Sequence, residues 1–402
     1  MRLLLLNRYF HPDISATSQL ASDLAFELAR QGVEVTAICS RQLYVDAAAH
    51  LLARDAHRGV AIVRVAATRF GRLRLAGRAL DYASYYVGAM WALWRRARRG
   101  DVVIAMTDPP LLGVAAATIC RLRGAVLVQW MQDAFPEVAV RIGVLHEGML
   151  ARLLQRLRNR SLERSQAVVV VGERVAARLA PHCARPPAVI PNWALEEDGE
   201  SHSPLRSEWG LEQHFVVGYS GNMGRAHRLR ELIDAAALLR GLPALRFVLI
   251  GGGAQRAALE QHARDVRAGN VQFRPYQPRE RLRDTLCVPD LHIVSLDESL
   301  EGLILPSKFV GAIALARPVL WIGDADGEIG TLIRDSGCGI VVPSGDAAAL
   351  AAVVRELAAD HAAGGARLAT MAASARALWQ ARFRREAALR AWNDVLESFS
   401  TG

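Results

Sequence analysis

Lys308 is the residue whose type and position point most directly to chemistry, because it is the only lysine in a chain whose other basic residues are all arginine. It ends the segment 301–308, Glu-Gly-Leu-Ile-Leu-Pro-Ser-Lys, between an expected strand (291–296) and an expected helix (309–316). An ammonium group is a compact charge that a forked guanidinium does not replace, and the first amides of a helix favour anions. The segment predicts a phosphate site; the alternative is a surface lysine without a role.

Two glycine-rich loops follow other expected strands. Gly221 and Gly224 come after the strand 215–219, and the nearby positive charges are Arg225, His227 and Arg228. Their amides could face an anion, although a tight turn explains the glycines equally well. The second loop, 251–253, is three glycines after the strand 247–250, but Arg256 occupies the third glycine place of a dinucleotide fingerprint. We therefore expect close backbone approach to a ligand here and no nicotinamide cofactor.

Polar side chains also end strands in the first half of the chain. Asp133 follows the strand 126–130, where a carboxylate could orient or deprotonate a hydroxyl group or could cap a helix before Pro136. Glu137 follows directly, and His11 and Asp13 follow the first strand, 3–6. We expect these side chains at the same rim, with a structural role as the alternative for His11.

Residues 82–99 combine tyrosines and tryptophans with a cluster of four arginines at the end. A second arginine cluster lies at 152–160. Aromatic, basic helices dock on anionic membrane surfaces, and the alternative is a packed helix with a solvated arginine end. No nucleic-acid recognition module is visible, so nucleic acid is not an expected partner.

Composition places the chain among folded proteins with acidic partners. Its 402 residues are 51% hydrophobic and 22% charged, with a net charge of +9. The five cysteines are widely spaced without a CxxC pair, which argues against a zinc site or a disulfide framework and favours a reducing cytoplasm. No signal peptide is expected, and no run reaches the roughly 18 apolar residues that span a bilayer. We expect a soluble or peripheral protein.

Strands and helices alternate along the chain, which predicts α/β architecture with parallel sheets. Strands are expected at 3–6, 33–39, 60–65, 102–105, 126–130, 167–171 and 188–190, with helices that include 18–31, capped by Ser18. A polar stretch at 192–212 suggests a domain boundary, after which the alternation restarts. The fold class is therefore two doubly wound, Rossmann-like domains of similar size facing a central cleft, and ligands are expected after the strands. The tail, 366–399, is expected to be helical.

A series of short segments, in this order, resembles the family 4 glycosyltransferases of the B-type, two-Rossmann fold, and within them the colanic-acid and O-antigen branch. The segments are 7–13 (NRYFHPD), 107–110 (TDPP), 132–137 (QDAFPE), 191–193 (PNW), 219–224 (YSGNMG), 251–253 (GGG), 301–303 (EGL), 306–308 (PSK) and 317–319 (RPV). Each segment alone is weak, but the series covers nearly the whole chain.

The resemblance implies a role for each domain. Residues 1–191, completed by a C-terminal helix at about 380–402, would bind the acceptor, and residues 192–379 would bind a nucleotide sugar. Lys308, with the amides around Gly221, would neutralise the leaving diphosphate, Glu301 would contact the transferred sugar, and Asp133 would face the acceptor. The implied donor-side residues are Gly221, Asn222, Met223, Gly224, Arg225, His227, Gly252, Gly253, Tyr276, Gly302, Leu303 and Ser307, and the implied acceptor-side residues are His11, Asp13 and Glu137.

The chain departs from the wider family at three places. The glutamate that grips the ribose in the wider family is replaced by Gly311. Asn222 and His227 fall near the places of an arginine and a lysine, a variant that the colanic-acid-like branch shares. The glycine-rich first loop of the family is replaced by residues 15–18, Ser-Ala-Thr-Ser.

The resulting hypothesis is a retaining glycosyltransferase, peripheral on the cytoplasmic face of a bacterial membrane, that extends a lipid-linked or polysaccharide acceptor in exopolysaccharide or O-antigen synthesis. No metal or cofactor is expected beyond the donor, with uridine as the default base and guanosine as the alternative. Two alternative functions remain. One is a nucleotide-sugar 2-epimerase of the same architecture. The other is a non-catalytic, membrane-bound scaffold, which the glycine at position 311 suggests because it replaces the glutamate of the wider family.

Overall fold

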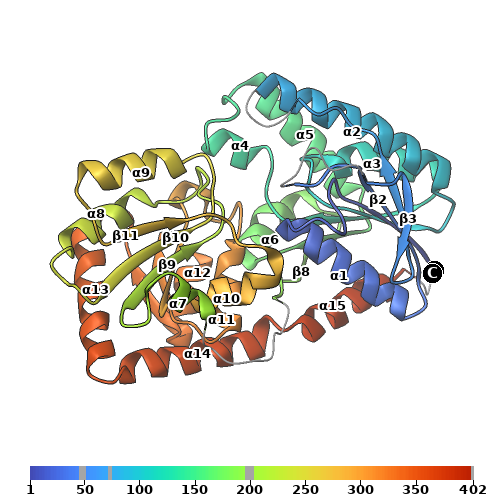
Figure 1. The fold of residues 1–402 in the computed structure, drawn as a ribbon. Helices are drawn as coiled ribbons and strands as arrows, with labels where there is room; N and C mark the ends of the chain where they lie inside the picture. The colour runs from blue at the N-terminus through green and yellow to red at the C-terminus, as the bar shows by residue number, and fades with distance from the viewer. Residues whose placement is uncertain (45–50, 71–74, 195–202, 400–402) are drawn as a thin grey trace. The chain divides into compact units, whose positions relative to one another are not determined.

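The computed structural model describes residues 1–44, 51–70, 75–194 and 203–399, and it divides the chain into two compact units (Figure 1). Unit 1 comprises Met1–Pro191 and Ala388–Gly402, and unit 2 comprises Asn192–Ala387. The chain therefore enters unit 2 once and returns to unit 1 for its last residues.

Unit 1 is built on a sheet whose central strands are buried on both faces. Within the described residues its eight strands are, in spatial order, β3 (Arg54–His57), β4 (Val60–Val65), β2 (Glu34–Ser40), β1 (Arg2–Leu6), β5 (Val102–Ala105), β6 (Val126–Met131), β7 (Ala167–Val170) and β8 (Ala188–Val189). All neighbours pair in parallel except β3 with β4. Leu3 to Leu6 are at most 1% exposed, as expected for a strand covered by helices on both sides.

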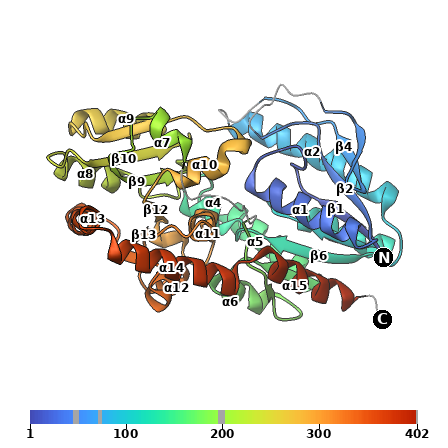
Figure 2. The same cartoon turned by 60° about the horizontal axis from the view of Figure 1, so that its bottom comes forward.

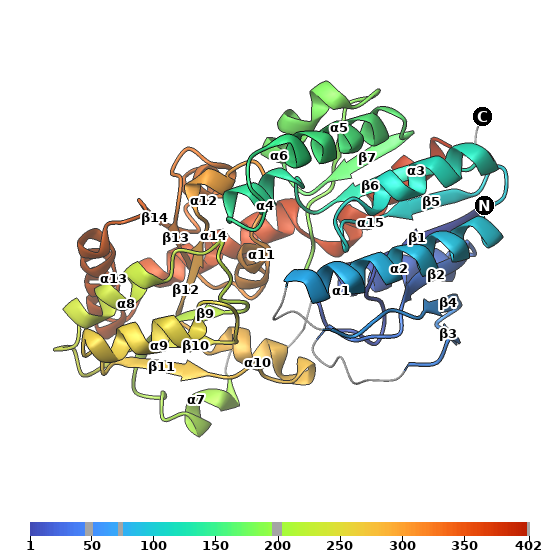
Figure 3. The same cartoon turned by 90° about the horizontal axis from the view of Figure 1, so that it is seen from above.

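Helices cover both faces of this sheet. They are α1 (Ala16–Arg30), α2 (Leu75–Arg96), α3 (Leu112–Arg123), α4 (Glu137–Arg141), α5 (Met149–Glu163), α6 (Glu173–Leu179) with the short η1 (Ala180–His182), and α15 (Arg385–Glu397). The helix α3 contacts both α2 and α5 (Figure 3). The helix α15 lies beside β6 (Figure 2). The Trp392 ring of α15 lies 4.8 Å from the Trp130 ring of β6, centroid to centroid, and both indoles are fully buried. No helix of the described residues is both long and apolar enough to span a bilayer.

Unit 2 is built on a second parallel sheet. In spatial order its strands are β11 (Val271–Arg274), β10 (Leu245–Ile250), β9 (Phe215–Ser220), β12 (Leu291–Ser295), β13 (Val319–Ile322) and β14 (Gly339–Val342). The helices are α7 (Pro204–Glu208), α8 (Arg230–Leu238), α9 (Arg256–Asp265), α10 (Leu282–Cys287), α11 (Ser307–Ala314), α12 (Glu328–Ser336), α13 (Ala347–Ala362) and α14 (Ala366–Arg382), with the short η2 (Arg279–Arg281) and η3 (Glu298–Leu300).

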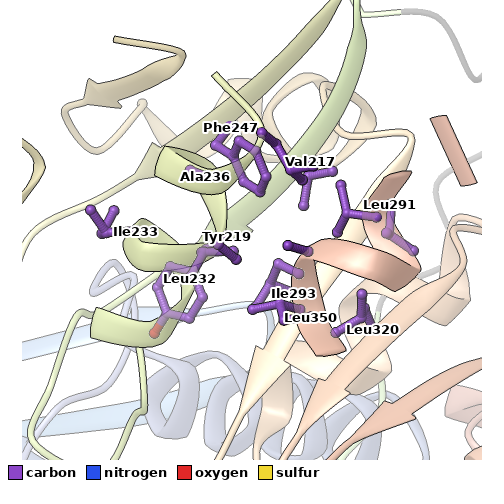
Figure 4. Close-up of a cluster of buried hydrophobic side chains, with 14 of the residues drawn as sticks. Val217, Tyr219, Leu232, Ile233, Ala236, Phe247, Leu291, Ile293, Leu320 and Leu350 are labelled. Carbon is purple, nitrogen blue, oxygen red and sulfur yellow. The ribbon is translucent and has the colours of Figure 1, made fainter. Parts of the chain in front are cut away.

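Apolar side chains from strands and helices fill the core of unit 2. Figure 4 shows Val217, Tyr219 and Phe247 of adjacent strands together with Leu232 of α8 and Leu350 of α13. The strand order 11-10-9-12-13-14 reverses direction at β9, so the loops after β9 and β12 meet at a topological switch point. Ligands bind at such points in doubly wound sheets.

The structure confirms the predicted α/β fold class and corrects three local predictions. Ser18 does not cap α1: the helix begins at Ala16 with Ser15 as its N-cap, because the Asp13 carboxylate accepts hydrogen bonds from the Ser15 amide and hydroxyl group. The tail is two helices, α14 and α15, broken at Phe383 and Arg384. The antiparallel edge strand β3 was not expected, because its sequence, Arg-Asp-Ala-His, lacks an apolar alternation.

Candidate active site

Lys308 lies in the first turn of α11, the helix that follows the segment 301–306. Its Nζ is 3.0 Å from Nε2 of His227 and 5.3 Å from the centroid of the Tyr219 ring. Burial lowers the pKa of Lys308 to about 8. Within the part of the chain that the structure describes, Lys308 makes no ion pair with a carboxylate. The site therefore contains a cation whose charge is not neutralised by those residues.

His227 orients this ammonium group as a neutral base. Its Nδ1 is 2.7 Å from the carbonyl oxygen of Ser295, which can only accept a hydrogen bond, so Nδ1 carries the proton. The lone pair on Nε2 then accepts from Lys308. Burial, and next the positive charge of Lys308, lower the pKa of His227 to about 4, so the imidazole is uncharged at neutral pH.

The loops after β9 and β10 interlock without room for side chains. Gly221 and Gly251 both have φ of +131°, a region that favours glycine. A Cβ on Gly251 would lie 2.1 Å from the Gly221 carbonyl oxygen, and a Cβ on Gly221 would lie 2.6 Å from Cε of Lys308. The Met223 amide donates to the Gly252 carbonyl at 2.6 Å. The lysine stem therefore lies directly on the glycine backbone.

The remaining donor-side residues named from the sequence fall into two groups. Asn222, Arg225, Tyr276 and Ser307 are exposed, and the Tyr276 ring lies against Gly252. In contrast, Met223 and Leu303 are buried in the core of unit 2, at 0% and 2% exposure. Only the backbone of these two residues could face a ligand.

The carboxylate of Glu301 lies at the N-terminal end of α12. Its Oε1 accepts a hydrogen bond from the Glu328 amide, at 2.8 Å, in the first turn of α12. A Cβ on Gly327 would lie 2.6 Å from its Oε2, so this glycine makes room for the carboxylate. This hydrogen bond could not be predicted from the sequence, because it joins two residues that are 27 positions apart.

Gly311, one turn after Lys308, has space beside it. A Cβ there would meet only Cδ1 of Leu286, at 3.6 Å, which is an ordinary contact. Packing therefore does not require glycine at the place where the wider family has a glutamate.

Asp133 of unit 1, which was expected from the sequence on the acceptor side, has a strongly raised pKa. Its Oδ1 is buried without a hydrogen bond within the described residues. Burial, and then repulsion from Asp108, raise the pKa of Asp133 to about 7, although a hydrogen bond from Thr107 opposes the shift. The group is therefore close to half protonated at neutral pH, as is suitable for contact with a hydroxyl group.

The other residues that were expected from the sequence on the acceptor side hold the loops of unit 1 together. The Asp13 carboxylate accepts from the Ser15 amide at 2.8 Å and from the Tyr44 amide. The His11 ring stacks on the His57 ring at 4.0 Å. Glu137 pairs with Arg158 at 2.6 Å. These contacts give each residue a structural function, whatever else it binds.

Comparisons with known proteins follow the same division of the chain. Residues 16–193 match the family described as Glycosyl transferase 4-like domain, and residues 214–360 match Glycosyl transferases group 1. A curated relative from Pseudomonas aeruginosa, "Probable glycosyltransferase WbjE", is 31% identical over 277 residues, which are 66% of this chain and 68% of the relative. The chain belongs to the group 1 glycosyltransferases. The resemblance found in the sequence is thereby confirmed.

Further comparisons agree with this family. "Putative colanic acid biosynthesis glycosyl transferase WcaI" from Escherichia coli (strain K12) is 25% identical over 295 residues, 69% of this glycosyltransferase and 72% of the relative. Sucrose-phosphate synthase from Thermosynechococcus elongatus has a TM-score of 0.77 at 17% identity, with 100% of both chains covered. Anabaena HepE in complex with UDP-glucose has a TM-score of 0.70 at 17% identity, again with 100% of both chains covered. At these identities the structural likenesses show the fold of the glycosyltransferase.

Sequence reasoning missed two parts of the site of this glycosyltransferase. The Tyr219 ring, beneath Lys308, could have been noticed as an aromatic residue at a strand end, two places before a glycine. The Ser295 carbonyl, which fixes the tautomer of His227, had no such signal, because a backbone acceptor carries no side-chain signature.

Proposed function

We propose that this glycosyltransferase moves a sugar from a nucleotide-sugar donor, held by unit 2, to a lipid-linked or polysaccharide acceptor, held by unit 1, with retention of the anomeric configuration. The observation that carries the proposal is Lys308, a partly buried ammonium group that His227 orients at the start of a helix. Such a group would stabilise the negative charge that develops on a departing diphosphate.

Uridine is the proposed base, and bacterial exopolysaccharide or O-antigen synthesis is the proposed setting. HepE has been solved with UDP and with UDP-glucose, WcaI is named for colanic acid biosynthesis, and WaaG is described as involved in lipopolysaccharide biosynthesis. The roles proposed for this chain follow from similarity to those proteins. On this proposal the chemistry uses no bound metal, so EDTA would leave the turnover unchanged.

In the proposed reaction the residues of this chain have separate tasks. Lys308 and the backbone amides after β9 hold the diphosphate, Glu301 contacts the transferred sugar, and the exposed Tyr276 ring offers a face to a planar group such as the base. Asp133 meets the acceptor hydroxyl group. Since Gly311 offers no carboxylate, the ribose is held without the second glutamate.

A binding panel with UDP, GDP, dTDP and ADP tests the donor side. At one hundred times its dissociation constant the correct nucleotide should add about 2.7 kcal/mol to the free energy of unfolding. Lys308→Ala should abolish most of this gain, whereas Arg355→Ala, which removes an exposed charge elsewhere in unit 2, should not. If none of the four nucleotides stabilises the wild type, the proposal is wrong.

Transfer of a radiolabelled sugar tests the reaction. Product should form only when donor and acceptor are both present, and the anomeric configuration should be retained. An epimerised donor formed without any acceptor would instead identify a 2-epimerase.

We also propose that unit 1 lies on the cytoplasmic face of an anionic membrane through α2 and α3. Val87 and Trp91 of α2 are 74% and 61% exposed, and a hollow of 440 Å³ opens between them, Met90, Trp94 and Ile119. The Arg123 guanidinium lies 5.2 Å from the Trp94 ring. Exposed tryptophans beside arginines are suited to the interface of an anionic bilayer.

Vesicle binding tests this surface. The protein should sediment with vesicles of phosphatidylglycerol and phosphatidylcholine and not with phosphatidylcholine alone. Replacing Trp91 and Trp94 by alanine should release it, whereas Leu238→Ala, an exposed apolar residue in unit 2, should not. Equal sedimentation of all variants would contradict the proposed surface.

A further inference from the structure

Arg8 is a buried cation directly after β1, the central strand of the unit 1 sheet. The residue is 6% exposed. Its guanidinium carbon lies 4.9 Å from the centroid of the Tyr82 ring and 5.3 Å from that of Tyr9, and its Nη2 donates to Oε1 of Gln42 at 3.0 Å. The side chain is therefore fixed in place by two rings and one amide.

What distinguishes Arg8 is the lack of a carboxylate. Among the described residues of unit 1, Arg64 and Arg158 are the other buried arginines, and they pair with Asp55 at 2.9 Å and with Glu137 at 2.6 Å. All three guanidinium groups leave one nitrogen without a hydrogen bond within the described residues, so a missing bond alone is not special. Of these three arginines, Arg8 is the one without an ion pair among the described residues.

A buried, unpaired guanidinium is costly unless an anion joins it. Contacts with two aromatic rings offset part of the cost, but a buried charge is normally paired and fully hydrogen-bonded. Structural packing alone would be served by an uncharged side chain at lower cost. The arginine is explained if the site receives a negatively charged ligand.

The position of Arg8 indicates where such a ligand lies. The strand β1 pairs with β5, which pairs with β6, and the Arg8 amide donates to the Asp108 carbonyl at 2.6 Å. Arg8 and Asp133 therefore both follow the carboxyl ends of strands at one edge of the sheet, where doubly wound domains bind ligands. The carboxylates of Asp108 and Asp133 disfavour an anion near β5 and β6, which leaves the Arg8 side of this edge.

We propose that Arg8 binds a phosphoryl group on the acceptor. The planar fork of a guanidinium matches the oxygens of a phosphate in a bidentate manner, and a charge-assisted pair of this kind is among the stronger polar contacts. This inference rests on the proposed function, in which unit 1 receives the acceptor.

The spacing of the strands adds a limit on the acceptor. Two strand spacings separate β1 from β6, which is about 10 Å. A separation of this order is spanned by one sugar ring together with the phosphate or diphosphate on its anomeric carbon. The acceptor class is a glycosyl phosphate or diphosphate whose first sugar receives the new residue.

Calorimetric titration of the full chain with phenyl phosphate tests the site, with saturating UDP present so that the donor site is filled. The wild type should bind this probe, and Arg8→Gln should weaken binding by about tenfold or more. Arg58→Gln, which removes an exposed guanidinium near the Phe26 ring of the same unit, should leave the affinity unchanged. Wild-type protein that does not bind, or Arg8→Gln protein that binds equally well, would overturn the proposal.

Two further arms separate the alternatives. Benzoate carries a carboxylate in place of the phosphate; if only benzoate binds in an Arg8-dependent manner, the phosphoryl assignment is wrong. Arg8→Lys keeps the positive charge but loses the planar guanidinium, so its affinity for phenyl phosphate should fall about fivefold. This variant also tests the proposal if Arg8→Gln does not fold. Unchanged affinity in Arg8→Lys would contradict bidentate binding.

Kinetics distinguish binding from a structural role. Arg8→Gln should raise the KM for a phosphorylated acceptor about tenfold and leave the KM for the donor unchanged. Lower stability without this split would show that Arg8 only supports the fold. If UDP does not bind, the proposed function fails by itself, and the phenyl phosphate titration in the Lys308→Ala background still decides the role of Arg8.

Discussion

The Nζ of Lys308 donates to Nε2 of His227 at 3.0 Å, and Nδ1 of the same imidazole donates to the Ser295 carbonyl at 2.7 Å. A lysine held by a carboxylate would have its charge neutralised before any ligand arrived. Here a neutral base accepts one of the three N–H hydrogen bonds of the ammonium group, which keeps its full positive charge. The departure from the wider family at position 227 therefore places an uncharged hydrogen-bond acceptor beside Lys308.

Lys308→Ala should lower kcat by about 100- to 1,000-fold, because it removes a donor that stabilises charge in the transition state. Lys308→Arg should not restore activity, since the stem lies against Gly221 and the larger fork has no room beside His227. Steady-state kinetics with donor and acceptor measure both effects. Full activity in Lys308→Ala, with Arg355→Ala as the control for lost charge, would remove Lys308 from the mechanism.

The activity should fall as the pH rises above about 8. Burial lowers the pKa of Lys308 to about 8, so the ammonium form predominates below that pH and is progressively lost above it. The profile of kcat/KM reports this pKa in the free enzyme. A bound diphosphate favours the charged form of Lys308, so kcat should begin to fall at a higher pH than kcat/KM does. If kcat and kcat/KM fall at the same pH, or if both stay constant up to pH 9.5, the proposed role of Lys308 is contradicted.

Gly251→Ala should be strongly destabilising. Its φ of +131° and the 2.1 Å approach of a Cβ to the Gly221 carbonyl oxygen force the loops apart, at a cost of about 2–4 kcal/mol. Gly241→Ala is the matched control, because nothing lies within 4 Å of a Cβ there. Urea unfolding measures both variants, and equal stabilities would mean that the loops do not interlock.

Asp133→Asn should raise the stability at pH 8 and change it little at pH 4. The pKa of Asp133 is raised to about 7, so between its unfolded value and pH 7 the folded protein binds a proton that the unfolded chain does not. Stability from this group therefore falls as the pH rises through that window. Asparagine removes the buried charge, with a gain of roughly 1–3 kcal/mol at pH 8.

Thermal unfolding at the two pH values checks the Asp133 prediction, with the exposed Asp335→Asn as the control. An equal loss of stability at both pH values would show that the carboxylate is ionised in the folded protein. Such a result would also weaken its proposed contact with an acceptor hydroxyl group.

The sequence was sufficient for the fold class and for selecting the residues proposed to bind phosphate, because both leave local signals. Leu3 to Leu6 form an uninterrupted apolar run, and Lys308 stands alone against an arginine-rich background. The sequence was insufficient wherever a contact joins distant segments through backbone atoms. The Glu301 carboxylate at the start of α12 is one example, and the Ser295 carbonyl at His227 is another.

Arg8 illustrates the same limit from the other direction. In the sequence it is one arginine among 48, since lysine and arginine together number 49 and one of these is Lys308. Only burial and the lack of an ion pair set it apart, and both are properties of the folded chain.

The contact between Trp130 and Trp392 has a consequence for how the protein is made. Residues 1–191 are synthesised before α15, so the part of the Trp130 indole that packs on Trp392 stays uncovered until residue 392 has been made. A nascent chain would thus carry an exposed aromatic surface through most of translation. Deletions that remove α15 should therefore harm the fold of unit 1.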